Sequence, residues 1–407
     1  MKKELFFVYL IVSVLGCHIE QPGVSETSLI DTLKVEFRSH DFLVDYKIDS
    51  TKFLILKTGE EIIPTISKVL MSEDMVYILS KPNNTIYALD LGGNLVFTID
   101  HQGNGPQEYN SVDDFGINIG KKILEIIDLR GQRILRYSAL SGKYLEEIDY
   151  VFYTYTFAPL EGGGRVFHNS VMPNGKYFNN SSLNAGVFFS DSSNKIVETY
   201  LDYDSTGITK SRLVTTQNIF RTFDQDYLYA PLYSNKIFKI NSVNETFQPR
   251  YLIDLGRHSM PTSFLKDYKG NPMEFDLYLN KSEYAHYITD FYENRSHISY
   301  WFLIANRPYK VIHDKKMKRT FAYERILKTG FDFNLEPIGV WKNQFITSVN
   351  YETLKSFITI YESRFSKEQL NQNYYYQQLL SLKQKSSSEN PILMFNSLVR
   401  VDHTEVE

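Results

Sequence analysis

Adjacent carboxylates are the first residues in this sequence whose type and position could do chemistry. Asp113 and Asp114 open a strand-like segment, DDFGINI, that follows a sharp Gly/Pro turn. If one carboxylate faces an interior channel, it can bind a cation or a cluster of water molecules. The alternative is structural, because an aspartate of this kind is usually satisfied by neighbouring backbone amides. Both interpretations stay open at this point.

The turn before these acids, HQGNGPQEY over residues 101–109, carries a second group of polar side chains. Its two glycines allow positive φ angles and its proline fixes φ, so the backbone can fold sharply. In a structural interpretation, Glu108 accepts backbone N–H groups inside the turn. In a functional interpretation, the turn lies at the mouth of a channel and presents His101, Gln107 and Glu108 to a ligand.

Aromatic side chains are concentrated in an insert over residues 254–294, where the strand pattern described below is interrupted. Its apolar positions mix helical and strand spacings, and we predict a helix there. The rings of the insert are Phe275, Tyr278, Tyr284, His286, Tyr287, Phe291 and Tyr292. Either they pack the insert onto its neighbours, or some of them, Tyr284 and Tyr287 in particular, cap a channel and stack on a sugar or peptide.

The single cysteine, Cys17, ends an N-terminal apolar segment. Two lysines precede residues 5–15, which are too few to span a bilayer but fit the core of a signal peptide. The segment ends in VLGC, which resembles a bacterial lipobox. We therefore predict that residues 1–16 are removed, that acyl chains on Cys17 anchor the protein, and that residues 17–29 form a tether. The alternative is a plain signal peptide in which Cys17 is incidental.

Composition and motif content limit the possible functions. The formal net charge is −4 over 407 residues, so no polyanion-binding field is expected and nucleic acid is not an expected partner. One cysteine excludes an internal disulfide and a cysteine-rich zinc site. The sequence contains no HExxH, GxSxG or Walker motif. We therefore expect no metal, no cofactor and no catalytic residue.

The elements that must position these side chains repeat along the chain. Residues 75–100 can be laid over residues 123–149 with one inserted residue, and Ile86 then aligns with Ile134. A self-similar unit of roughly 48 residues with four strands is typical of a β-propeller blade. We predict an all-β fold, a six-bladed β-propeller over residues 30–407.

Both ends of the chain are expected to close the ring. LKVEF or KFLILK, near the N-terminus, would pair with the last blade and leave no open sheet edge there. Residues 391–399, PILMFNSLV, would add a closing strand to the same blade, which also includes FITIYE at 357–362 as a strand. Residues 366–383 begin with a capping box, SKEQ, and are predicted to be helical.

Three segments resemble the six-bladed β-propeller lipoproteins of Bacteroidetes, an NHL-like propeller family. They are GNGPQEY followed by VDDFGI, the pair KILEIID and RILRYS, and the chain end SENPILMFNSLV. That family carries a GxGPxEY turn before its second blade and an acidic-Asn-Pro-hydrophobic strand at the C-terminus. The resemblance covers nearly the whole mature chain and is weakest over 150–204 and 254–294. It implies the fold and a cell-envelope location, and it implies no particular activity.

These observations predict a lipid-anchored propeller in the bacterial cell envelope, on either the periplasmic or the surface face. We predict a non-catalytic binding or interaction module for a glycan, peptide or protein, held to the membrane by its N-terminal lipid. The alternative is a hydrolase or lyase that acts on carbohydrate or lactone substrates in the axial pocket. Such an enzyme needs acids or histidines from several inner strands, whereas Asp113 and Asp114 belong to one.

Overall fold

The computed structural model describes most of the chain after the predicted tether. Cys17 and residues 17–29 lie outside the described residues. The described ranges are 30–40, 42–169, 185–202, 219–231, 233–268, 270, 274–324, 336–385 and 390–401.

Three four-stranded antiparallel sheets follow one another along the chain, and in each of them consecutive strands pair. Most of their strands are rich in β-branched and aromatic residues, which pack well on a pleated surface. Gly93 and Gly142, at equivalent turns of the first two sheets, have φ angles of 81° and 67°, which side chains disfavour. The strands are β3 (Lys68–Met71), β4 (Met75–Ser80), β5 (Thr85–Asp90) and β6 (Leu95–Ile99); β7 (Asp114–Asn118), β8 (Ile123–Asp128), β9 (Arg133–Ser138) and β10 (Tyr144–Asp149); and β11 (Phe157–Pro159), β12 (Arg165–His168), β13 (Ala185–Ser190) and β14 (Ile196–Asp202).

A nine-stranded sheet follows, and it consists of two four-stranded antiparallel groups joined by β1 (Asp31–Arg38). The first half of β1 runs parallel to β18, and its second half runs parallel to β22. LKVEF, which lies in β1, therefore bridges the two groups instead of closing the last sheet. The other strands are β15 (Phe220–Phe223), β16 (Asp226–Tyr229), β17 (Lys236–Asn241), β18 (Thr246–Asp254), β19 (His286–Glu293), β20 (His297–Ile304), β21 (Arg307–Asp314) and β22 (Arg319–Glu324).

The last sheet combines a strand from the N-terminal part of the chain with three strands from its C-terminal part. Its order is β2 (Tyr46–Ile55), β25 (Ile392–Arg400), β24 (Gln344–Val349) and β23 (Gly339–Trp341). β25 pairs antiparallel with both β24 and β2. The predicted pairing of the KFLILK segment with the C-terminal strand is present, since residues 52–55 of β2 face residues 392–395.

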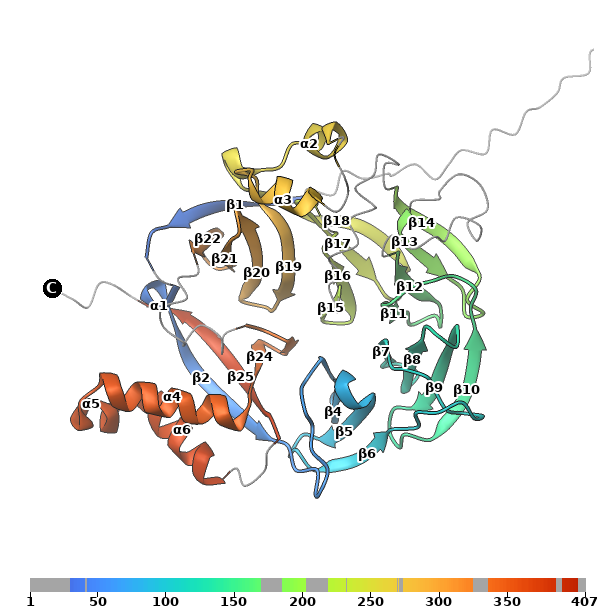
Figure 1. Ribbon diagram of the computed structural model, residues 1–407, viewed down its shortest axis with the longest axis horizontal. Coiled ribbons are helices and arrows are strands. Elements are labelled where there is room, and N and C mark those ends of the chain that lie inside the picture. Colours follow the sequence, from blue (N-terminus) through green and yellow to red (C-terminus); the bar gives the residue numbers. More distant parts are fainter. Residues whose placement is uncertain are drawn as a thin grey trace, which may run out of the picture.

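The sheets surround a central axis in a mostly β, propeller-like arrangement. Figure 1 shows β7, β11 and β15 near the centre and β6, β10, β14 and β2 at the outside. First strands of different sheets contact one another around the axis: β11 with β7, β15 with β23, and β23 with β3. The apolar core lies between neighbouring sheets, as where Ile86 and Ala88 of β5 pack with Phe115 and Ile126 of the next sheet.

The helices lie outside the strand meanders. Figure 1 shows α4, α5 and α6 beside the last sheet at the outside of the ring, where they pack on Ile392 and Met394 of β25. In the described part of the chain, no helix is both long enough and apolar enough to cross a membrane. The helices are α1 (Phe42–Asp45), α2 (Thr262–Asp267), α3 (Phe275–Asn280), α4 (Tyr351–Arg364), α5 (Lys367–Gln372) and α6 (Tyr374–Lys385), with short 3₁₀ turns η1 (Lys81–Asn83) and η3 (Gly256–His258).

FITIYE is helical, and its prediction as a strand was wrong. It lies in α4, whose N-cap Asn350 accepts a hydrogen bond from the Thr353 backbone N–H. The buried residues of α4 have helical spacing, and they are Leu354, Phe357, Ile358 and Tyr361. The capping box at Ser366 and Gln369 is present, and the helical stretch that follows it is divided into α5 and α6.

The insert is shorter than the range 254–294. Helices α2 and α3 lie between the end of β18 and the start of β19, and residues 286–293 form β19 itself. Tyr287 and Asp290 have φ angles of 56° and 51° in this strand, and the pairing with β20 shifts register twice. Such bulges change which face each side chain points to, which explains the mixed spacing in the sequence.

Candidate functional site

A pocket of about 360 Å³ lies where the first strands of four sheet units converge, and we call it the axial pocket. Its walls come from β3, β7, β11 and β15, with the start of β16. Four short strands from separate parts of the chain therefore build one concavity, as is usual for ligand sites. Its main apolar lining residues are Leu70, Ile117, Phe157, Pro159, Phe220 and Tyr227.

The pocket has a buried end and an exposed end. Lys68, at the start of β3, lines it and is buried. The turn residues Ile119, Asp224 and Gln225 also line it and are exposed. Because the first strands run in the same direction, the turns that follow them form the mouth and their first residues form the deep end.

Asp114 joins three sheets at the deep end. Its carboxylate accepts a hydrogen bond from Lys68 Nζ of the first sheet at 2.7 Å. It also accepts from Thr156 Oγ1 at 2.5 Å and from the Phe157 backbone N–H at 3.3 Å, both in the third-sheet segment. Lys68 Nζ donates in addition to the Phe115 carbonyl oxygen. Burial lowers the pKa of Lys68, and the charge of Asp114 partly opposes that effect by raising it.

The mouth of the pocket is acidic. Glu161, Asp224 and Asp226 line it, and Lys239 Nζ pairs with Asp226 at 2.6 Å. Tyr227 donates its hydroxyl to the Pro159 carbonyl oxygen. Burial and then the nearby carboxylates, Glu161 foremost, raise the pKa of the Tyr227 hydroxyl well above its ordinary value.

Gly116 allows two walls of the pocket to approach each other. A Cβ atom at this position would lie 2.4 Å from Pro159 Cδ, which is sterically impossible without displacement. Glycine in the middle of β7 therefore sets the spacing between β7 and β11.

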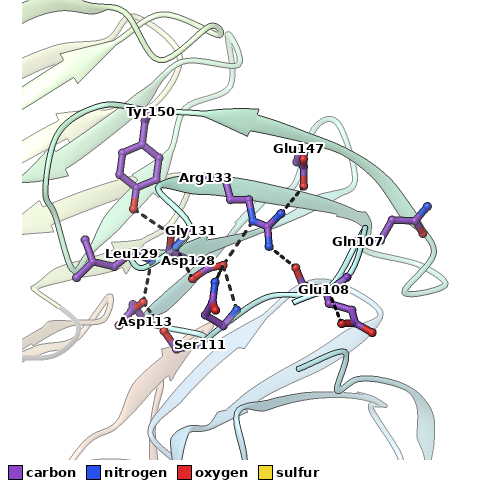
Figure 2. Close-up of polar contacts among 12 residues, drawn as sticks. Gln107, Glu108, Ser111, Asp113, Asp128, Leu129, Gly131, Arg133, Glu147 and Tyr150 are labelled. Carbon is purple, nitrogen blue, oxygen red and sulfur yellow. Dashed lines mark hydrogen bonds and ion pairs between the residues drawn. The ribbon is translucent and has the colours of Figure 1, made fainter. Parts of the chain in front are cut away.

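The turn over residues 101–109 does not line the axial pocket and is held to β9 by bonds from Arg133 and Tyr137. Glu108 Oε2 accepts from the Gly105 backbone N–H at 2.6 Å, as its structural interpretation predicted. The buried Tyr109 hydroxyl donates to the carbonyl oxygens of Asn84 and Ile99. His101, Gln107 and Glu108 do not line the axial pocket; in Figure 2 the Gln107 side chain points away from the polar network.

A buried acid and an arginine hold this turn to the second sheet (Figure 2). Arg133 donates to the Glu108 carbonyl oxygen at 2.5 Å and to Glu147 Oε2 at 3.0 Å. Asp128 accepts from the Asn110 backbone N–H and from the Gly131 backbone N–H. These contacts give the turn a structural role.

Asp113 is also satisfied within its own sheet. Its Oδ2 atom accepts from Ser111 Oγ at 2.8 Å and from the Leu129 backbone N–H at 2.9 Å (Figure 2). Asp113 therefore has the bonds that the structural interpretation of the acid pair requires, and Asp114 is likewise satisfied within the protein, by Lys68 and by the Phe157 backbone N–H.

Tyr284 and Tyr287 lie beside the insert helices. Figure 1 shows α2 and α3 at the periphery of the ring. The Tyr284 ring packs edge-on against Phe264 with centroids 4.9 Å apart, and the Tyr287 ring lies 5.5 Å from that of Tyr233. Neither tyrosine lines the axial pocket, and the binding role predicted for them stays a prediction.

The residues that build the pocket were not singled out from the sequence. Lys68 had a usable signal, since it is the one charged residue in the apolar segment ISKVLM. Glu161, Asp224 and Asp226 had none, because acids in turns are ordinary surface residues. Among the described residues, no three His, Cys, Asp or Glu side chains come together in a group that could hold a metal ion.

Comparison with known proteins places the chain in a family. The solved structure of an exported protein from Bacteroides fragilis is similar, with a TM-score of 0.71, 19% identity, and coverage of 92% of this chain and all of the other. A member of the DUF4221 family from Bacteroides vulgatus has a TM-score of 0.50 at 9% identity, covering 88% of this chain and 99% of the other. These likenesses show a shared fold. The curated proteins contain no match. A family model described as a domain of unknown function, DUF4934, matches residues 35–397, and the chain therefore belongs to the DUF4934 family.

Proposed function

We propose that this protein is a six-bladed β-propeller that acts as a non-catalytic binding module, with its ligand in the axial pocket. The blade count takes the nine-stranded sheet as two blades joined by β1. The observation that carries the proposal is the pocket itself, whose walls come from the first strands of four blades. A site built on rigid strands from several blades is preorganised for binding.

The proposed location is the cell envelope, with the protein anchored through acyl chains on Cys17. The apolar N-terminal segment and the VLGC sequence support it. The exported protein among the structures with the same fold adds support for secretion. In this setting the ligand is a small envelope molecule, or an exposed group of a glycan, peptide or protein.

The proposal can be tested with a substitution whose side chain fills the axial pocket. Thr222 lines it from β15 and is exposed, so Thr222→Trp should occupy the cavity without disturbing the core. Thr246→Trp is the matched control, since Thr246 is exposed on the outermost strand of the same blade and does not line the pocket.

The probes are phenethylamine, phenethyl alcohol and hydrocinnamate, three small aromatic molecules with different charges. Binding is measured by saturation-transfer NMR and by calorimetry. We expect at least one probe to bind wild type and Thr246→Trp, and to lose binding in Thr222→Trp. If no probe binds, or if Thr222→Trp leaves binding unchanged, the axial pocket is not the binding site.

A further inference from the structure

The two ends of the axial pocket differ in charge balance, and this difference bears on the ligand. At the deep end the Lys68 ammonium is matched by the Asp114 carboxylate at 2.7 Å. The pair is neutral as a whole and is closed off by bonds to Phe115 and Thr156. A charged ligand group gains little there, whereas the adjoining apolar walls favour a ring or an alkyl chain.

At the mouth, carboxylates outnumber their counter-ions. Lys239 pairs with Asp226, and Lys121 Nζ donates to the Gly162 carbonyl oxygen at 3.0 Å. Among the described residues, Glu161 and Asp224 have no ion-pair partner. Glu245 adds a further carboxylate next to Gly162, where a Cβ atom would lie 2.8 Å from its Oε1 atom.

Exposed apolar groups lie beside these acids. Ile119 and Val243 line the pocket and are both about half exposed. A surface that combines apolar groups with unmatched negative charge is complementary to a molecule that carries positive charge on an apolar body.

We propose that the axial pocket binds an amphipathic cation, with its apolar body between β7, β11 and β15 and its ammonium or guanidinium group at the mouth near Glu161 and Asp224. This assignment rests on the proposed function and adds the chemical class of the ligand to it. The pocket volume of about 360 Å³ limits the bound part to the size of a small molecule or one long side chain.

The three phenyl probes test the charge preference directly, because they share one aromatic body. At low ionic strength we expect phenethylamine to bind tightest, phenethyl alcohol next and hydrocinnamate weakest. A spread of about tenfold between cation and anion is expected for partly solvated charges at this distance. The spread should shrink as salt is added.

A double substitution, Glu161→Gln with Asp224→Asn, should reduce the preference for the cation to about twofold or less. The matched control is Glu60→Gln with Glu61→Gln, which removes two exposed acids from the loop between β2 and β3 without altering the pocket lining. The control should keep the wild-type preference. The ammonium group of the natural ligand can belong to a lysine side chain of a peptide or to a free small amine, and an acetylated and amidated Phe-Lys dipeptide distinguishes the two. Tighter binding of the dipeptide than of phenethylamine indicates a peptide ligand, and weaker binding indicates a free amine.

The inference is overturned if phenethyl alcohol or hydrocinnamate binds as tightly as phenethylamine in wild type, or if the Glu161/Asp224 variant keeps the full preference. Either result leaves the proposed function intact as long as binding is still lost in Thr222→Trp. If no probe shows binding that depends on Thr222, the proposed function itself fails.

Discussion

Replacing Asp114 by asparagine tests whether a buried ion pair holds three sheets together at the axis. Asp114 is 3% exposed and Lys68 is 6% exposed, so the ammonium would lose its counter-charge in a site that is largely shielded from water. Breaking a buried pair by removing one partner costs about 3–5 kcal/mol. The carboxylate also accepts hydrogen bonds from Thr156 and Phe157, so the upper part of that range is expected.

The variant should also acquire a distinctive pH dependence. Burial already lowers the pKa of Lys68, and loss of Asp114 removes the main charge that raises it. The unfolded chain then binds one more proton than the folded chain between the lowered pKa and the ordinary lysine value, so stability rises with pH through that window. The loss relative to wild type should therefore be smaller at pH 9 than at pH 7.

Urea unfolding at both pH values measures the free energy of unfolding of the variant and of wild type. The double variant that combines Lys68→Met with Asp114→Asn is measured beside them. The double variant should recover part of the stability, because no uncompensated charge remains. A loss below about 1 kcal/mol for Asp114→Asn, or a double variant no more stable than the single one, would refute the reasoning.

Three further predictions concern the chain ends and a buried histidine. Deleting residues 391–407 removes β25 from between β24 and β2, together with four core side chains whose burial contributes about 6 kcal/mol or more. The deletion should therefore abolish the cooperative melting transition measured by circular dichroism. A variant that melts like the full-length protein would contradict this. Cys17→Ala should move the protein from the detergent phase to the aqueous phase without changing its melting temperature, and equal partitioning of the two would remove the lipid anchor. Burial lowers the pKa of His168 to about 4, so only the unfolded chain takes up a proton as the pH falls from 6.5 toward 4. The free energy of unfolding is therefore highest above pH 6.5 and should fall by about 3 kcal/mol across this window. Urea titrations at several pH values should show a smaller loss in His168→Gln.

Strand periodicity carried much of the fold prediction. The alignment of residues 75–100 with 123–149 corresponds to equivalent strands of the first two sheets, and the capping box at Ser366 begins a helix as expected. These features were readable because side-chain alternation, turn glycines and helix caps depend on residues close together in the chain. The role of Glu108 inside its own turn was readable for the same reason.

Other features needed the tertiary structure. Residues 286–293 concealed a strand because bulges at Tyr287 and Asp290 break its alternation, and FITIYE suits a strand as well as a helix until its neighbours are known. The axial pocket combines Lys68, Glu161 and Asp224 from three sheet units, and Asp114 of a fourth pairs with Lys68 at its deep end. Their proximity is decided by how the sheets pack around the axis, and that packing depends on contacts between residues far apart in the chain. The sequence by itself thus determined the local elements and the repeat, whereas the position and charge of the pocket follow only from how the sheets pack around the axis.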